Sequence, residues 1–207
     1  MIKISRLSAY SLLFSRDSGG VRRFPAELFR VKVMNYANIK YCDIANGVGV
    51  RTSVFVSGCR NHCKECFNRE TWDFAFGKPF TEETENEVIE SVAPDYIAGL
   101  TVLGGEPFEP ENQSGVLDLI RKIKAKYPGK SVWVYSGFTL EELRSGSRAS
   151  GRTCDEILSL IDVLVDGRFV QEKYNISLRF RGSENQRIID MPKTRKEGKI
   201  ILWEDAL

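Results

Sequence analysis

Residues 51–68 read RTSVFVSGCRNHCKECFN, a strand-like run that leads into a loop with three cysteines. The thiols belong to Cys59, Cys63 and Cys66, in the spacing C-x-x-x-C-x-x-C. Thiolates are soft ligands that suit iron–sulfur clusters, zinc or copper(I), and one short loop can place three sulfurs on the same side of a metal centre. The remaining cysteines, Cys42 and Cys154, lie far away in the sequence, so the loop has no nearby fourth thiol. The spacing therefore predicts a four-iron cluster with one iron left for an exogenous ligand.

Two other interpretations use the same loop. His62 could complete a structural zinc site, because cysteine and histidine together are common zinc ligands. Zinc sites usually pair their ligands in two separated clusters, however, whereas here all four candidates lie within one short loop. Cys63 and Cys66 could instead form a thiol redox pair, which leaves Cys59 without a role. The cluster interpretation accounts for all three cysteines.

A second polar motif, Gly104-Gly105-Glu106-Pro107, follows the short apolar run 98–103. Two glycines allow a ligand or another backbone to approach closely, and a glutamate carboxylate can hydrogen-bond a cationic or amino group. On its own, this composition is also typical of an ordinary strand-to-helix turn. Its position after a strand, downstream of the cysteine loop, favours a ligand-binding role.

Together the two motifs resemble the signatures of radical S-adenosylmethionine (SAM) enzymes, in which the Gly-Gly-Glu-Pro loop meets the methionine amino group of SAM. Further segments resemble one subgroup, the glycyl radical enzyme activases that act on anaerobic ribonucleoside-triphosphate reductase. These segments are 58–72, 132–137, 163–167 and 181–186. The last contains Arg181-Gly182-Ser183, which we interpret as a turn that docks the partner or closes the site. The resemblance extends from Met34 almost to the C-terminus.

The resemblance implies an enzyme that holds a [4Fe-4S] cluster on Cys59, Cys63 and Cys66 and binds SAM at the open iron. Reductive cleavage of SAM would yield methionine and a 5′-deoxyadenosyl radical, which takes hydrogen from a glycine of the large reductase subunit. The implied partners are that subunit and a low-potential electron donor such as flavodoxin or ferredoxin. The alternatives are an activase of another glycyl radical enzyme, of the pyruvate formate-lyase type, and a non-catalytic zinc or iron–sulfur protein.

For SAM, the resemblance indicates residues in both motifs and after two later strands. Most radical SAM enzymes place an aromatic residue just before the third cysteine, whereas here Glu65 holds that position and Phe67 follows Cys66. We expect the adenine to contact Phe67 and the backbone around Glu65. Ser136 and Asp166 are expected to complete the pocket. The expected cofactor-binding set is Glu65, Cys66, Phe67, Gly104, Gly105, Glu106, Ser136 and Asp166.

Strand-like and helix-like segments alternate from residue 38 onward. Expected strands lie within 38–57, around a glycine turn, and over 98–103, 131–135 and 163–165. Expected helices begin at Thr81, Thr139 and Asp155, and a further helix is marked by Val116, Leu117, Ile120 and Ile123. This alternation predicts an α/β fold with a mostly parallel, curved sheet and helices on its outer face. Eight βα units need ~250 residues, so 207 residues fit a partial (β/α) barrel of the radical SAM type, as the resemblance also implies. The motif residues follow strands, at the sheet edge where such folds bind ligands.

The composition indicates which classes of partner and which cellular compartment to expect. The formal net charge is +2 and the charges are interspersed, so no nucleic-acid partner is expected. Five cysteines, an odd number with three of them clustered, favour metal binding in a reducing compartment over a disulfide framework, and we expect a cytoplasmic location. No apolar run approaches the ~20 residues that cross a bilayer, so no membrane partner is expected.

Residues 1–33 differ in composition from the rest, because serine and arginine recur and acidic residues are scarce. This composition has some transit-peptide character. Because members of the family begin with a segment that resembles Met34-Asn35-Tyr36, we expect instead a start codon assigned too early or a disordered extension. The domain prediction is an N-terminal extension over 1–33 and a radical SAM activase domain over 34–207.

Overall fold

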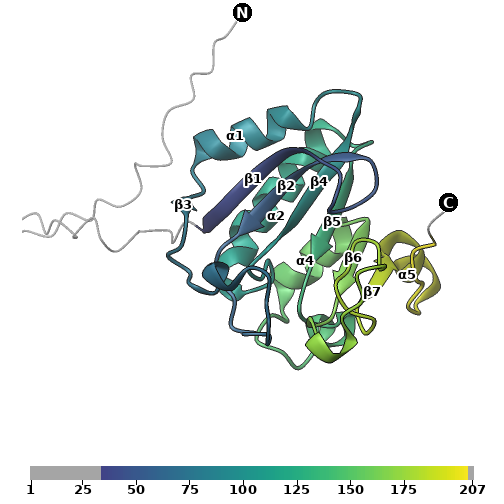
Figure 1. The fold of residues 1–207 in the computed structure, drawn as a ribbon. Helices are drawn as coiled ribbons and strands as arrows, with labels where there is room; N and C mark the ends of the chain where they lie inside the picture. Colours follow the sequence, from purple (N-terminus) through teal and green to yellow (C-terminus); the bar gives the residue numbers. More distant parts are fainter. Residues whose placement is uncertain (1–33, 205–207) are drawn as a thin grey trace, which may run out of the picture. The chain divides into compact units, whose positions relative to one another are not determined.

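The computed structural model describes residues 34–204, and the predicted extension over 1–33 lies outside the described residues. In the described part, seven strands form one sheet in the order β3-β1-β2-β4-β5-β6-β7 (Figure 1). The strands are β1 (Asn35–Asp43), β2 (Val50–Val56), β3 (Lys78–Pro79), β4 (Ile97–Gly104), β5 (Ser131–Tyr135), β6 (Val163–Asp166) and β7 (Arg187–Asp190). The helices are α1 (Glu82–Ser91), α2 (Pro110–Lys126), α3 (Leu140–Arg144), α4 (Arg152–Leu160) and α5 (Met191–Glu197), with short 3-10 turns η2 (Arg69–Trp72) and η3 (Gln171–Lys173).

The direction of the strands differs between the centre of the sheet and its edges. The four central strands β2, β4, β5 and β6 run parallel, as the alternation predicts. Both edges are antiparallel, because β1 pairs with β2 and β3, and β7 pairs with β6. The short turn over 44–49 can join only an antiparallel pair, since a parallel connection needs a crossover of a dozen or more residues. The α/β class is therefore confirmed. The sheet is not closed, and the barrel is not confirmed.

Alternate side chains of the central strands pack on opposite faces of the sheet, in two different apolar clusters. Val132 and Leu164 belong to the main core, which the helices cover, and Figure 1 shows α2 and α4 together behind the central strands. Trp133 and Val163, one residue away, point to the opposite face and form a smaller apolar cluster there with Trp203. Successive side chains of a strand point to opposite faces, so a strand covered on both faces is apolar at consecutive positions.

Two helices begin at capping residues that the sequence indicates, and other elements differ from the prediction. The Thr81 hydroxyl accepts the Thr84 amide at 3.3 Å and caps α1, as predicted. α3 begins at a full capping box between Thr139 and Glu142. α4 begins at Arg152, three residues before the expected start, and β7 and α5 are elements that the sequence pattern does not indicate. Four residues of strand are too few for a two-residue period to stand out.

A buried arginine joins the amino-terminal ends of three central strands. The side chain of Arg51 is almost fully buried, at 1% exposure. It donates to Thr101 Oγ1 at 2.7 Å, to the Leu100 carbonyl at 2.7 Å and to the Ser131 carbonyl at 3.0 Å. The guanidinium also lies over the Trp133 ring, 5.4 Å from its centroid. These contacts connect β2, β4 and β5 at the edge of the sheet opposite the cysteine loop.

The carboxyl ends of the parallel strands carry the predicted motifs. β2 leads into the cysteine loop and β4 into the Gly-Gly-Glu-Pro loop, while Ser136 follows β5 and Gly167 follows β6. Parallel order brings all four loops to one edge of the sheet, as predicted. None of the helices in residues 34–204 has the length and apolar character that crossing a bilayer would require.

Candidate functional site

The cysteine loop leaves β2 and folds back on η2. The Gly58 amide donates to the Thr71 carbonyl at 2.8 Å, and the Cys59 amide donates to the Trp72 carbonyl at 3.2 Å. Gly58 has φ +96°, and a Cβ at this position would lie 2.2 Å from the Phe74 ring. Only glycine fits this close approach, so the residue before the first cysteine sets the path of the loop.

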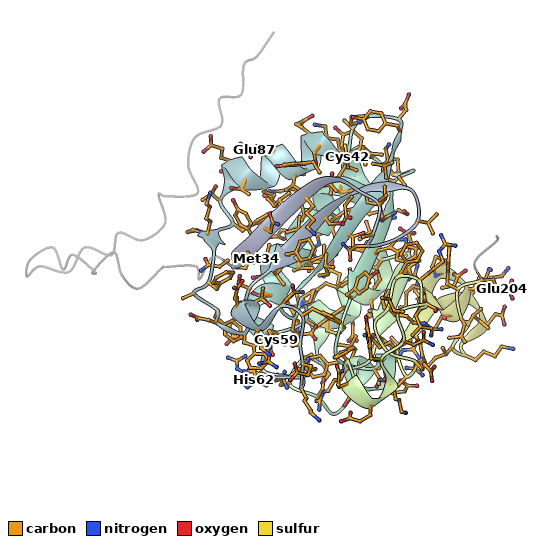
Figure 2. All side chains as sticks on the ribbon, viewed as in Figure 1. Met34, Cys42, Cys59, His62, Glu87 and Glu204 are labelled. Carbon is orange, nitrogen blue, oxygen red and sulfur yellow. The ribbon has the colours of Figure 1, made fainter. Side chains whose placement is uncertain are left out.

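The three predicted ligands line one cavity of about 200 Å³. Cys59 is buried at 8% exposure, whereas Cys63 and Cys66 are partly exposed. Figure 2 shows Cys59 at the site end of the sheet and Cys42 at the other end. Burial raises the pKa of the Cys59 thiol to about 12 and also raises the pKa of Cys63. Because the metal ligand is the thiolate, these thiols must release their protons when a metal binds.

The Gly-Gly-Glu-Pro loop packs directly on the cysteine loop. The Gly105 amide donates to the Val56 carbonyl at 2.7 Å, and the Glu106 amide donates to the Gly58 carbonyl at 2.9 Å. A Cβ on Gly105 would lie 2.7 Å from the Gly58 carbonyl oxygen. Gly104 and Gly105 both line the cavity. The two predicted motifs therefore form one surface.

The carboxylate of Glu106 points into the protein. It is fully buried and accepts the Phe108 amide at 3.0 Å, the Ser136 hydroxyl at 2.9 Å, the Gly137 amide at 2.7 Å and the Asn61 amide group at 3.1 Å. Burial raises the pKa of Glu106 to about 7. Each carboxylate oxygen already accepts two hydrogen bonds, so the side chain links three loops of the site. Its contact with the SAM amino group stays a prediction.

Ser136 and Asp166 lie in different surroundings. Ser136 lines the cavity, although its hydroxyl donates to Glu106. Asp166 is fully buried; its carboxylate accepts Arg187 Nε at 2.9 Å and the Leu140 amide at 2.7 Å. The next residue, Gly167, lines the cavity in this region. The structure thus brings Ser136 to the cysteines and directs the Asp166 carboxylate to Arg187.

The far wall of the cavity comes from the connection between β6 and β7. Phe67 is 71% exposed and lines the cavity; its ring centroid lies 5.1 Å from that of Phe169. The Gln186 side chain accepts the Gly182 amide at 2.9 Å and donates to the Gly167 carbonyl at 3.0 Å. The turn with Arg181 is therefore part of the cavity wall. Glu65 lies on the exposed side of the loop and pairs with Arg69 at 2.9 Å.

Several cavity residues are absent from the predicted set. They include Asn61, Trp72, Tyr135, Phe169 and Gln186. The position in the sequence could have indicated three of these residues. Asn61 lies between two cysteines, Tyr135 precedes Ser136, and Gln186 ends the segment 181–186. Phe169 carries no signal in the sequence, because it reaches the cavity only through the fold of a connection without regular structure.

His62 is stacked on an aromatic ring. Its imidazole lies 4.5 Å from the Trp72 ring, centroid to centroid, at an interplanar angle of 27°. Within residues 34–204, no three His, Cys, Asp or Glu side chains are grouped so as to hold a single metal ion. A four-iron cluster does not require such a group, because each thiolate binds a different iron.

The residues around the cavity fit a cluster with a polar organic ligand. Three soft thiols line it from one loop, which is the donor set of an iron–sulfur cluster. The cavity residue Trp72 also carries a buried polar atom, Nε1, that finds no hydrogen-bond partner in the described part of the chain. Buried polar atoms are normally paired, so this atom is consistent with a polar group that binds nearby.

Comparison with known proteins agrees with this chemistry. Residues 45–189 match the family model described as a 4Fe-4S single cluster domain. A protein of Vibrio cholerae is 41% identical over 155 residues, which cover 74% of this chain and 96% of the relative. Proteins of Escherichia coli K12 (40% identical, 74% and 96% covered) and of enterobacteria phage T4 (36% identical, 75% and 93% covered) are similar as well. All three relatives are named anaerobic ribonucleoside-triphosphate reductase-activating protein.

Proposed function

Because the chain belongs to the family of anaerobic ribonucleoside-triphosphate reductase-activating proteins, we propose that it is an enzyme that activates such a reductase. The observation that carries the proposal is geometric. Three thiols of one loop line a single cavity, together with the glycine pair whose loop is hydrogen-bonded to the cysteine loop. This arrangement would allow a metal centre and an organic ligand to bind side by side.

Cys59, Cys63 and Cys66 would hold the [4Fe-4S] cluster, with SAM beside it. When bound, the reduced cluster would supply the electron for cleavage of SAM into methionine and a 5′-deoxyadenosyl radical, which would take a hydrogen atom from a glycine of the large reductase subunit and leave a glycyl radical. The chain itself must bind SAM, orient it and exclude water. The low-potential electron donor, such as flavodoxin or ferredoxin, and a cytoplasmic location belong to the same proposal.

We assign the binding of SAM to residues around the cavity. Gly104 and Gly105 contribute to the cavity wall, and Ser136 lines the same cavity. Phe67 offers an aromatic face to the adenine, next to the backbone of Glu65 and Cys66. Asp166 would act indirectly, because its carboxylate caps the first turn of α3 and binds Arg187.

The hydrogen bonds of Glu106 support a similar role for that residue. By accepting from Ser136 and Asn61, Glu106 holds the β5 loop against the cysteine loop. A direct bond from its carboxylate to the SAM amino group would require one of these donors to give way. We also propose that the open sheet is the partial (β/α) barrel of the radical SAM type, with the cavity at its carboxyl edge.

Release of 5′-deoxyadenosine tests the proposed function. The protein would be reconstituted with iron and sulfide without oxygen, reduced and supplied with SAM. Wild-type protein is expected to release 5′-deoxyadenosine, the Cys63→Ala variant is expected to release none, and the Cys42→Ala variant, whose thiol is exposed at the other end of the sheet, is expected to match the wild type. A filled four-iron cluster without cleavage of SAM would contradict the proposal.

A further inference from the structure

A second glutamate, Glu109, lies just beyond the Gly-Gly-Glu-Pro motif and has no assigned role. It is the residue before the first turn of α2, and its side chain is fully buried. Its carboxylate accepts the backbone amide of Arg60 at 2.8 Å and the Arg60 guanidinium at 2.7 Å. Arg60 directly follows the first cysteine ligand. The contact therefore ties both the main chain and the side chain of the cysteine loop to α2.

Arg148 extends this contact to the next residue of the loop. It donates to Glu109 through Nε at 3.0 Å and through Nη2 at 2.7 Å, and Nη2 also donates to Asn61 Oδ1 at 3.0 Å. Its guanidinium lies over the Phe138 ring, 4.6 Å from the centroid. Burial opposes the charge of Glu109, but the hydrogen bonds from Arg148 and Arg60 hold its pKa below the usual value. An ionised carboxylate thus joins three segments that are distant in sequence.

Among residues 34–204, no fully buried carboxylate holds the second half of the cysteine loop in this way. Lys64 pairs with Glu172 at 3.1 Å, but both side chains are largely exposed, and the pair of Glu65 with Arg69 is exposed as well. Exposed ion pairs contribute little to stability, because water screens them. The half that contains Cys59 is therefore held by charge-assisted hydrogen bonds to a fully buried carboxylate, whereas the ion pairs of the half that contains Cys66 lie at the surface.

We propose that Glu109 is a positioning residue that, through Arg60 and Arg148, fixes the Cys59 half of the loop and sets the retention and the reduction potential of the cluster bound there. The inference rests on the proposed function only in that a cluster must occupy the cysteine loop. Groups that orient metal ligands typically change metal affinity or activity by about 10- to 100-fold when they are replaced. Net charge and hydrogen bonding around a cluster also set its potential.

The midpoint potential of the cluster separates the proposed role from a merely structural one. Loosening of the loop alone would not shift this potential in a defined direction. Glu109→Gln removes one negative charge near the cluster, which favours the more negative reduced state and makes the midpoint potential less negative. Arg148→Met removes one positive charge from the same network and makes the potential more negative. Both variants loosen the loop, so both are expected to release iron about 10- to 100-fold faster than the wild type.

The test uses the full chain, reconstituted without oxygen, in three variants and the wild type. Iron release to a ferrous chelator gives retention, and a redox titration followed by electron paramagnetic resonance gives the midpoint potential. The matched control is Glu85→Gln, which removes a mostly buried carboxylate paired with Lys122, away from the cavity. This control is expected to match the wild type in both measurements.

Each outcome has a distinct meaning. Faster iron release in both site variants, with potentials that move in opposite directions, supports the positioning role. Potentials and release rates equal to those of Glu85→Gln would overturn it, even if the wild type cleaves SAM. If one of the two site variants fails to fold, the test rests on the other variant, for which the direction of the potential shift is also predicted. A wild-type chain that takes up no cluster would overturn the inference and the proposed function together.

Discussion

The amide nitrogen of Glu106 donates a hydrogen bond to the carbonyl oxygen of Gly58 at 2.9 Å, so the two motifs of the site are joined main chain to main chain. Gly105 forms the parallel contact with the Val56 carbonyl. The position of the cysteine loop therefore depends on the loop that follows β4. A change in either loop is transmitted to the other without any ligand between them.

Replacement of Gly105 by alanine tests this dependence. The added Cβ would lie 2.7 Å from the Gly58 carbonyl oxygen and 3.0 Å from that of Thr71, both backbone atoms that cannot move aside freely. We expect Gly105→Ala to lower the free energy of unfolding by about 1–3 kcal/mol and to lower the iron content. Denaturant unfolding and iron analysis measure both effects. Gly129→Ala is the control, since apart from its chain neighbours no described residue lies within 4 Å of its Cβ position, and a decrease of similar size there would contradict the account.

Glu106 is expected to make stability depend on pH. Its pKa in the folded protein, about 7, lies above its ordinary value of 4.5, so the folded state binds the proton more tightly than the unfolded state. The resulting stability is fully present below pH 4.5 and is lost as the pH rises to about 7. The difference in unfolding free energy between wild type and Glu106→Gln should fall by roughly 3 kcal/mol over that range. A difference that does not change with pH would show that burial does not raise this pKa.

Arg51 is expected to contribute strongly to the stability of the sheet. Arg51→Met leaves the Thr101 hydroxyl and the Leu100 and Ser131 carbonyls without their buried donor. Because each unsatisfied group costs about 1–3 kcal/mol, we expect a loss of at least about 3 kcal/mol in the free energy of unfolding. Arg121→Met removes an arginine whose side chain is 49% exposed and paired at the surface, and it should cost less than about 1 kcal/mol. Equal losses in the two variants would contradict the role of Arg51.

Phe67 is expected to affect the binding of SAM more than stability. The side chain is 71% exposed, so Phe67→Ala should change the free energy of unfolding by no more than about 0.5 kcal/mol. Loss of one aromatic contact, at about 0.5–1.5 kcal/mol, corresponds to a roughly 2- to 10-fold higher KM for SAM. Steady-state release of 5′-deoxyadenosine measures this value. Tyr96→Ala, at 67% exposure and outside the cavity, is the control. An unchanged KM in Phe67→Ala would remove Phe67 from the adenine site.

The sequence predicts the parts of the site that depend on local pattern. The cysteine spacing, the glycine pair and the strands before them locate three thiols and two glycines at one edge of the sheet, and the structure agrees. Parallel order follows from alternating strands and helices. The antiparallel edges are harder to foresee, because β3 has two residues and β7 has four, too few to show a period.

The directions of the buried carboxylates could not be predicted from the sequence. Glu109 meets Arg148 across 39 positions, and Asp166 meets Arg187 across 21. Such pairs depend on tertiary packing, and no local motif identifies them. For the same reason, the hydrogen bonds of Glu106 and Asp166 to other parts of the protein could not be foreseen, and their contacts with SAM stay predictions. The roles of Asn61 and Arg60 likewise follow from hydrogen bonds to partners that are distant in sequence.

The most direct test of the central claim is the formation of a glycyl radical on the large subunit of anaerobic ribonucleoside-triphosphate reductase. The reconstituted chain would be mixed with that subunit, SAM and a reductant without oxygen, and followed by electron paramagnetic resonance. We expect a glycyl radical signal on the reductase, with about one 5′-deoxyadenosine released per radical, and no signal with Cys63→Ala. A chain that carries a four-iron cluster and cleaves SAM but forms no radical on the reductase, or forms one only on a pyruvate formate-lyase type enzyme, would contradict the account.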